Sequence, residues 1–246
     1  MVRLASLPLA PHRASPIYRR TIVAPPAFAS RLIVMLKEPV AGRVKTRLAR
    51  EVGAVRATSF YRTTSSALLA RVYHPRRWKT RLAIAPDAAV NSRAWRNYSR
   101  RRQGSGDLGK RMQRIMDTEP PGPVIVIGTD VPTATATHIA AALKSLGSHD
   151  AVFGPSPDGG YWLVGFKRRP RIPRGFASVK WSSRDALAHT VANLSGLSVA
   201  CIETLADVDE AGDLTQVGDA LGRTILPATY QKDAQFCGVM STETTI

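Results

Sequence analysis

The sequence predicts an α/β protein with a mostly parallel sheet and helices on both faces of that sheet. Three observations support this class. Short apolar runs alternate along the chain with stretches of helical periodicity. The clearest run, 124–129, holds four consecutive apolar residues after a Pro-Gly-Pro turn, as a buried central strand does. The chain has 246 residues, of which 44% are hydrophobic and 22% charged, and this suits one sizeable globular core.

The expected elements follow in chain order, each bounded by residues that start or stop it. A buried strand at 31–37 precedes a helix from 46 to about 72, which Gly53 interrupts. The other expected strands are 81–85, ended by Pro86, then 124–129, 151–154, 161–166 and 198–204. The other expected helices are 108–116, 133–146 with Gly147 just beyond it, and 182–195, opened by Ser182 and Asp185 and ended by Gly196.

One domain, residues 31–226, is expected to hold all these elements. Residues 1–30 carry four arginines, no acidic residue and no regular periodicity. They are expected to be a disordered leader, with an arginine-rich transit peptide as the alternative. Residues 227–246 are polar and without pattern, which predicts a loose C-terminal tail.

The formal charge of +17 is unevenly distributed: the net charge is +10 over residues 1–70, +9 over 71–120 and −2 over 121–246. The total alone suggests a nucleic-acid partner. The arginine run 100–102 lacks a recognition motif, and the nearby Trp78, Trp95 and Tyr98 are a poor stacking platform, so no specific nucleic-acid partner is expected. A basic first half that folds against a carboxylate-bearing second half instead suits phosphate and metal binding together.

Two classes of protein are excluded by composition. The longest apolar runs fall far short of the roughly 20 residues that span a bilayer, so no membrane span is expected. The two cysteines, Cys201 and Cys237, exclude a disulfide scaffold and a four-cysteine zinc site. The low cysteine count favours a reducing compartment, and a cytoplasmic location is expected.

Ligand sites in such sheets lie at the carboxyl ends of the strands. After the first strand come a Pro and a Gly, then Arg43, Lys45 and Arg47, then a helix. A glycine turn at a helix start offers backbone N–H groups to an anion, and the three cations add charge. Gly42, Arg43, Lys45 and Arg47 are therefore candidate phosphate ligands, although the segment is no Walker A loop. A solvated basic turn is the alternative.

The segment Gly104–Gly109 matches the G-x-G-x-x-G pattern of dinucleotide-binding proteins. That pattern requires a strand before it, and residues 100–103 are not expected to form one. A loop over a ligand that leads into the 108–116 helix is the preferred interpretation.

Carboxylates follow two of the later strands. Asp130 comes at the end of the clearest strand, where it suits a divalent cation shared with substrate phosphates. Capping of the next helix is its alternative role. Asp207 and Asp209 follow the last strand and share a face on an extended chain, so they are also candidate metal ligands. For Asp209, the alternative is capping of a final helix.

A turn with two prolines and two glycines connects the 151–154 and 161–166 strands. Asp158 lies at its tip, Gly159 and Gly160 allow a ligand to approach the backbone, and Tyr161 can stack on a base or sugar. An ordinary tight hairpin with core aromatics is the alternative.

The order of these motifs resembles a known family. The patterns are K-x-P-x-x-G-x-V-K-T-R-L, G-D-L-G-x-R-M, G-T-D-x-P, G-P-x-x-D-G-G-Y-W-L-x-G, W-S and D-V-D-x-x-x-D-L, and the resemblance that they carry covers about residues 32 to 218. They resemble a bacterial family of small GT-A-like transferases, once catalogued as a domain of unknown function and associated with arsenosugar biosynthesis. Molybdenum-cofactor and 2-phospho-L-lactate guanylyltransferases are similar at a greater distance.

The resemblance implies a nucleotide-diphospho-sugar transferase sheet and a division of roles. The first-loop residues would lie by the nucleotide phosphates, and Asp130, with Asp207 or Asp209, would hold Mg²⁺ or Mn²⁺. Asp158 would bind sugar hydroxyls or act as base beside Asp130. The donor or acceptor contacts would be Asp107, Gly159, Gly160, Tyr161 and Trp181.

Two transferase activities fit these expectations. The first is metal-dependent glycosyl transfer from a nucleotide-sugar to a small-molecule acceptor. The alternative is nucleotidyl transfer from an NTP to a phosphorylated small molecule, as in guanylyltransferases. Only Gly42 follows the first strand, whereas many nucleotidyltransferases have repeated glycines there, so glycosyl transfer is favoured.

Overall fold

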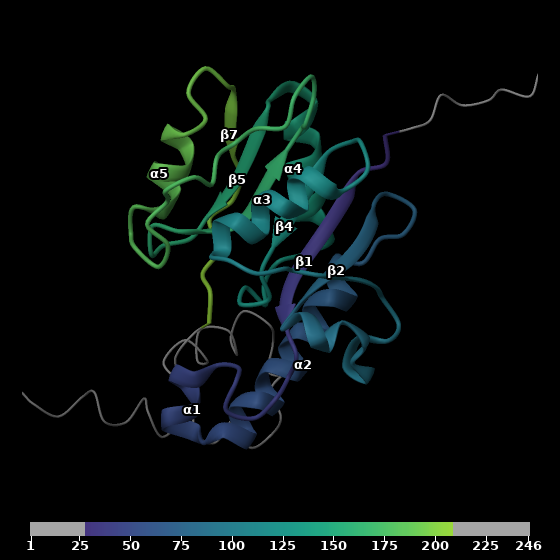
Figure 1. The fold of residues 1–246 in the computed structure, drawn as a ribbon, viewed down its shortest axis with the longest axis vertical. Coiled ribbons are helices and arrows are strands. Elements are labelled where there is room, and N and C mark those ends of the chain that lie inside the picture. Colours follow the sequence, from purple (N-terminus) through teal and green to yellow (C-terminus); the bar gives the residue numbers. More distant parts are fainter. Residues whose placement is uncertain (1–27, 209–246) are drawn as a thin grey trace, which may run out of the picture.

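The structure, a computed structural model, describes residues 28–208. The predicted leader up to residue 27 and the predicted tail at 227–246 lie outside the described residues, as does the end of the predicted domain. The described residues form one seven-stranded sheet with helices packed on it (Figure 1). Within this part of the chain no helix combines the length and the apolar character needed to cross a membrane.

The strands are β1 (Arg31–Lys37), β2 (Lys79–Ala85), β3 (Ser99–Arg102), β4 (Val124–Ile127), β5 (Ala151–Pro155), β6 (Tyr161–Phe166) and β7 (Val199–Cys201). The helices are α1 (Thr46–Val52), α2 (Ala54–Val72), α3 (Leu108–Thr118), α4 (Ala136–Ser148) and α5 (Ala186–Ala192), with short 3-10 turns η1 (Asp87–Asn91) and η2 (Arg93–Trp95).

The sheet has the strand order β3-β2-β1-β4-β6-β5-β7. The pairs β1/β2, β2/β3, β1/β4 and β5/β7 are parallel, whereas β6 pairs antiparallel with both β4 and β5. Among the described strands only β6 therefore runs against the rest. The predicted mostly parallel α/β fold is confirmed, and the carboxyl ends of β1, β2, β4 and β5 meet along one edge.

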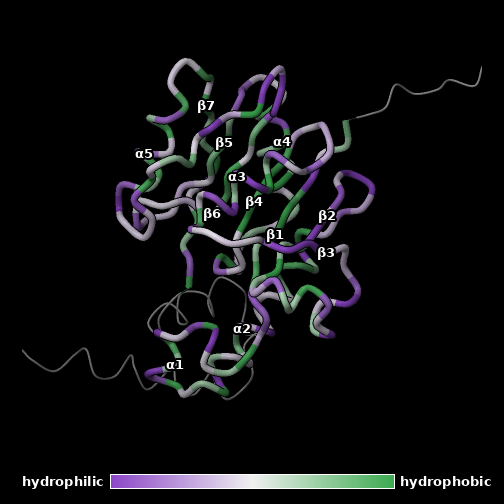
Figure 2. Tube along the Cα trace, in the orientation of Figure 1, coloured by the Kyte–Doolittle hydropathy of each residue, from purple (hydrophilic) through white to green (hydrophobic). Residues whose placement is uncertain are grey.

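Successive residues of β1 point to opposite faces of the sheet, and each face has its own core. Leu32 and Val34 pack in a cluster with side chains of α2 and α4, whereas Ile33 packs with Met112 and other residues of α3. The strands at the centre of the sheet are correspondingly hydrophobic (Figure 2). Helices therefore cover both faces, as predicted.

The predicted interruption at Gly53 separates α1 from α2. Gly53 has φ 86° and ψ 152°, a backbone conformation that breaks the helix and that residues with a Cβ rarely adopt. The two helices pack together, and Val208 at the end of the described chain joins Leu48 and Phe60 in a small third core. The chain after β7 thus returns to the first helices, which becomes important at the site.

Three local predictions were wrong. Residues 99–102 form the edge strand β3, although three arginines made a strand unexpected. Helix α4 continues through Gly147, because the chain keeps a helical conformation up to the cap at His149. Helix α5 begins only at residue 186, because Ser182 takes φ 59° and Asp185 makes no capping hydrogen bond through its side chain.

Candidate functional site

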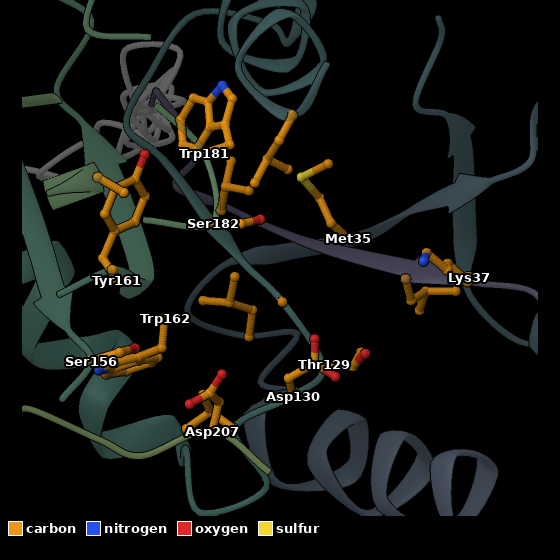
Figure 3. A pocket seen from close by; sticks show the side chains of 18 of the residues that line it. Met35, Lys37, Thr129, Asp130, Ser156, Tyr161, Trp162, Trp181, Ser182 and Asp207 are labelled. Atoms are coloured by element: carbon orange, nitrogen blue, oxygen red, sulfur yellow. The ribbon is translucent and has the colours of Figure 1, made fainter. Parts of the chain in front are cut away.

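A cleft of about 490 Å³ lies along the carboxyl edge of the sheet (Figure 3). Its walls come from the loop between β1 and α1, the end of β4, the turn between β5 and β6, the segment before α5, and the chain after β7. Eight of the predicted site residues line it: Lys45, Arg47, Asp130, Asp158, Gly160, Tyr161, Trp181 and Asp207. The sequence therefore located the cleft through residues from five separate segments.

Lys45 links three of these segments. Its ammonium forms an ion pair with the Asp130 carboxylate and donates a hydrogen bond to the carbonyl oxygen of Val208. The Lys45 side chain is only 6% exposed, whereas that of Asp130 is 50% exposed. The backbone N–H of Val208 also donates to the Asp130 carbonyl oxygen at 2.8 Å. Lys45 is thus a buried cation that holds the end of β4 against the chain that carries Asp207.

The other predicted phosphate ligands are spread more widely than the motif suggested. Arg47 is exposed in the first turn of α1 and lines the cleft. Arg43 instead lines a neighbouring hollow of about 470 Å³, beside Lys37 and Arg111. Gly42 is an exposed turn residue with φ 76° that lines neither of these two cavities. The cations therefore form a wall that continues from the cleft into the hollow.

Asp130 and Asp207 both line the cleft on the side near the end of β4 (Figure 3). Asp209 lies outside the described residues. No group of three or more histidine, cysteine, aspartate or glutamate side chains gathers within residues 28–208. Two carboxylates fit a Mg²⁺ or Mn²⁺ ion that takes its remaining oxygen ligands from water and from substrate phosphates. Asp130 and Asp207 are thus two carboxylates of the cleft that could hold such an ion, and Asp130 is also paired with the Lys45 ammonium.

The turn between β5 and β6 is a tight hairpin, as the alternative interpretation expected, and it also lines the cleft. Asp158 Oδ1 accepts a hydrogen bond from the backbone N–H of Gly160 at 2.9 Å, and Asp158 is among the residues that line the cleft. Gly159 has φ 85°, and a Cβ there would lie 1.9 Å from the carbonyl oxygen of Arg184. Gly159 therefore shapes the turn rather than lining the cleft.

The two aromatic residues after this turn point to opposite faces of the sheet. Trp162 is buried and donates its indole N–H to the carbonyl oxygen of Glu203 at 3.1 Å. Tyr161 has its hydroxyl 3.3 Å from Thr190 Oγ1 and its ring 6.4 Å from that of Trp181. Burial raises the pKa of Tyr161 well above its ordinary value, so its phenol stays neutral.

The G-x-G-x-x-G segment does follow a strand, β3, contrary to the prediction. Its residues nonetheless have local roles. Asp107 is exposed, accepts a hydrogen bond from Lys110 N–H at 2.8 Å as the N-cap of α3, and lines neither cavity. A Cβ at Gly104 would lie 2.3 Å from the Arg114 guanidinium, and one at Gly109 would lie 2.7 Å from the Trp181 indole. These glycines make room for side chains, as close helix packing requires.

Sequence reasoning missed two polar residues at the site. Gln103 is buried and donates to the carbonyl oxygens of Leu36 at 3.0 Å and Ala83 at 2.8 Å, at the ends of β1 and β2. Arg111 donates to Gly106 O at 2.8 Å and to Gln103 Oε1 at 3.5 Å, and lines both the cleft and the hollow. The arginine of the G-D-L-G-x-R-M motif was the available signal for Arg111.

Tyr61 was also missed. Its hydroxyl accepts from the N–H of Lys37 at 2.8 Å and donates to the carbonyl oxygen of Lys37 at 3.1 Å. Burial raises the pKa of Tyr61, while hydrogen bonds with Thr129 and with the Lys37 backbone oppose the rise. Tyr61 fastens the end of β1 and lies beside the end of β4, so it stiffens the floor of the cleft.

Comparison with solved structures gives the class of the protein: it is a transferase with the nucleotide-diphospho-sugar transferase fold. A structure from Desulfovibrio desulfuricans G20, provisionally described as a nucleotide-diphospho-sugar transferase, is 27% identical with a TM-score of 0.73, and the match covers 86% of this chain and 96% of that one. A cytidylyltransferase from Leptospira borgpetersenii is 10% identical with a TM-score of 0.50, with 89% and 99% covered, and shares the fold.

The bifunctional IspDF of Campylobacter jejuni, also 10% identical with a TM-score of 0.50, matches over 76% of this chain and 54% of its own. Residues 68–183, just under half of the chain, match the model of a family described as an uncharacterized protein conserved in bacteria, DUF2064. These matches confirm the resemblance to small bacterial GT-A-like transferases that the motif order indicated. No curated protein matches the chain.

Proposed function

We propose that the protein transfers a glycosyl group from a nucleotide-sugar to a small-molecule acceptor, with Mg²⁺ or Mn²⁺ at the cleft. The observation that carries this proposal is the meeting of Lys45 and Arg47 with Asp130 and Asp207 along one cleft at the carboxyl edge of the sheet. Cations for a diphosphate beside carboxylates for a divalent cation suit a nucleotide-sugar. The likeness to the Desulfovibrio protein supports the same donor class.

The position of each residue in the cleft suggests its role in binding the donor. Arg47 would bind the diphosphate through its forked guanidinium, and Arg43 and Arg111 would extend the positive wall toward the nucleoside. Lys45 would keep Asp130 in place and add a fixed positive field. Asp130 and Asp207 would hold the divalent cation, which supplies Lewis-acid stabilisation of the leaving diphosphate.

In the transfer step the hydroxyl oxygen of the acceptor forms a bond to the anomeric carbon of the sugar. The bond from that carbon to the diphosphate oxygen breaks with its electron pair, and the nucleoside diphosphate leaves. Asp158 is the group proposed to take the hydroxyl proton. One of its oxygens already accepts from Gly160 N–H, which orients the carboxylate.

A donor-turnover assay tests the proposal. Purified full-length protein is supplied with a panel of nucleotide-sugars and Mn²⁺, and release of nucleoside diphosphate is measured. Asp130→Asn is expected to lower turnover by about 100-fold, because it removes one carboxylate of the metal site while keeping its shape. Asp117→Asn, on α3 beside Arg174, is the matched control and should leave turnover unchanged. Full activity of Asp130→Asn without metal would refute the metal role.

The second candidate is nucleotidyl transfer from an NTP to a phosphorylated small molecule. Its motivation is the shared fold with the Leptospira cytidylyltransferase. The same cations and carboxylates would serve this reaction, so the products must separate the two. Pyrophosphate released from an NTP favours this candidate, whereas nucleoside diphosphate released from a nucleotide-sugar favours glycosyl transfer.

A further inference from the structure

One part of the cleft differs in chemistry from the charged part. Met35, Leu108, Met112, Tyr161 and Trp181 line it, and we name these five residues the aromatic lobe. Met112 belongs to the core on the α3 side of the sheet, and Met35, Tyr161 and Trp181 pack against that core. In Figure 3, Met35, Tyr161 and Trp181 lie on the side of the cleft away from Asp130 and Asp207.

The aromatic lobe is built before any ligand arrives. The Tyr161 ring stands edge-on to Phe153 at 5.1 Å and to Trp181 at 6.4 Å, and its hydroxyl is held by Thr190. The Trp181 indole lies against Gly109, where even a methyl group would approach to 2.7 Å. A rigid aromatic surface of this kind binds a flat or apolar group at little cost in ordering.

The polar groups around the aromatic lobe are few and mostly engaged. Arg111, which lies one turn along α3 from Leu108, bonds to Gly106 O and Gln103 Oε1. Ser182 lies between Trp181 and Met35 and lines the cleft, so it offers a hydroxyl for one hydrogen bond (Figure 3). Ser182 also has φ 59°, a left-handed conformation that non-glycine residues adopt infrequently.

The five side chains of the lobe carry no charge, and the cation beside them, Arg111, already donates to Gly106 O and Gln103 Oε1, so a charged group that packs on the lobe would lose hydration without a partner among these five. We propose that the aromatic lobe binds an uncharged acceptor through a ring or apolar face. This inference rests on the proposed function, since it names the acceptor class of that transfer. A phosphorylated acceptor, which nucleotidyl transfer requires, fits this lobe poorly.

A matched pair of probes tests the inference on the full-length protein. Isothermal titration compares 2-phenylethanol with 2-phenylethyl phosphate, which carries the same ring and adds the charge. The alcohol is expected to bind more tightly. Trp181→Ala is expected to weaken alcohol binding by at least about fivefold, because one aromatic wall is lost, whereas Trp181→Phe keeps a ring and stays within about twofold.

Leu108→Asp gives a second test of alcohol binding that does not depend on the packing of Trp181. Leu108 is 43% exposed at the first position of α3, where an aspartate is compatible with folding. A carboxylate there should abolish alcohol binding. Tighter binding of the phosphate ester, or alcohol binding unchanged in both Trp181→Ala and Leu108→Asp, would overturn the inference.

Thermal shift with nucleoside diphosphates and Mn²⁺ on the same samples separates this inference from the proposed function. A nucleotide-induced shift without alcohol binding overturns the aromatic lobe as an acceptor site and leaves the donor site standing. Alcohol binding that depends on Trp181, without any nucleotide-induced shift, supports the lobe as a site for uncharged ligands and contradicts the donor chemistry.

Discussion

Replacement of Lys45 by methionine probes the link between the first loop, Asp130 and the chain end. Methionine keeps much of the apolar stem but removes the ammonium that pairs with Asp130 and bonds to Val208 O. Breaking a fully buried pair costs about 3–5 kcal/mol, whereas an exposed pair contributes about 0–1 kcal/mol. Because Asp130 is half exposed, water compensates part of the loss, and we expect about 2 kcal/mol.

The measurement is urea unfolding of wild-type protein, Lys45→Met and Lys144→Met. Lys144 is exposed on α4 and serves as the matched control for loss of a lysine charge. A loss of about 2 kcal/mol corresponds to a fall in Tm of about 4–8 °C for a chain of this length. In an Asp130→Asn background the cost of Lys45→Met should shrink, because the ion pair is already gone. Equal stability of Lys45→Met and Lys144→Met would refute the assigned role.

Three further predictions concern the stability of the fold. Gly159→Ala should destabilise the protein by about 3 kcal/mol in urea unfolding, because the backbone there is left-handed and the new Cβ would clash with a carbonyl oxygen. The control is Gly147→Ala in α4, where a Cβ meets nothing within 4 Å, and this variant should be neutral or stabilising. Glu119→Gln should cost about 3 kcal/mol by the same measurement, because the buried carboxylate pairs with three arginines that would lose their shared partner. Hydrogen bonds from Ser198 lower the pKa of Asp150 in the folded protein. The ionised Asp150 carboxylate therefore stabilises the fold above the ordinary aspartate pKa, and this stabilisation is lost as the pH falls through the lowered pKa. Asp150→Asn should therefore flatten the acid side of the stability profile between about pH 5 and 2, and an unchanged slope would contradict this assignment.

The central strands were predictable because their signal is local. Arg31–Lys37 and Tyr161–Phe166 have the predicted bounds, since each is an apolar run between clear stop signals. Edge strand β3 was missed because its arginines suggest a solvated segment. The charge of one of them is balanced by a residue distant in sequence, because Arg101 pairs with the buried Glu119. Such a pairing across the fold leaves no pattern in the local sequence.

The site was predictable in its location but less so in its roles. Motifs at strand ends identified Lys45, Asp130 and Asp158, because the carboxyl ends of the strands converge in this kind of sheet. The tie from Lys45 to Val208 could not be read from spacing, since 163 residues separate the two. Asp107 matches a family motif, yet the geometry gives it a helix cap. Sequence thus predicted which segments meet at the cleft, and only the fold distinguishes a charge that faces the cleft from a structural one.

The most direct test of the proposed metal and diphosphate site is a crystal of the full-length protein grown with a nucleoside diphosphate and Mn²⁺. The manganese anomalous signal locates the cation without assumptions about activity. We predict a peak bound by Asp130, with Asp207 beside it and the diphosphate oxygens completing its coordination near Arg47. A bound nucleotide whose manganese lies away from Asp130, or a nucleotide bound outside the cleft, would contradict the account.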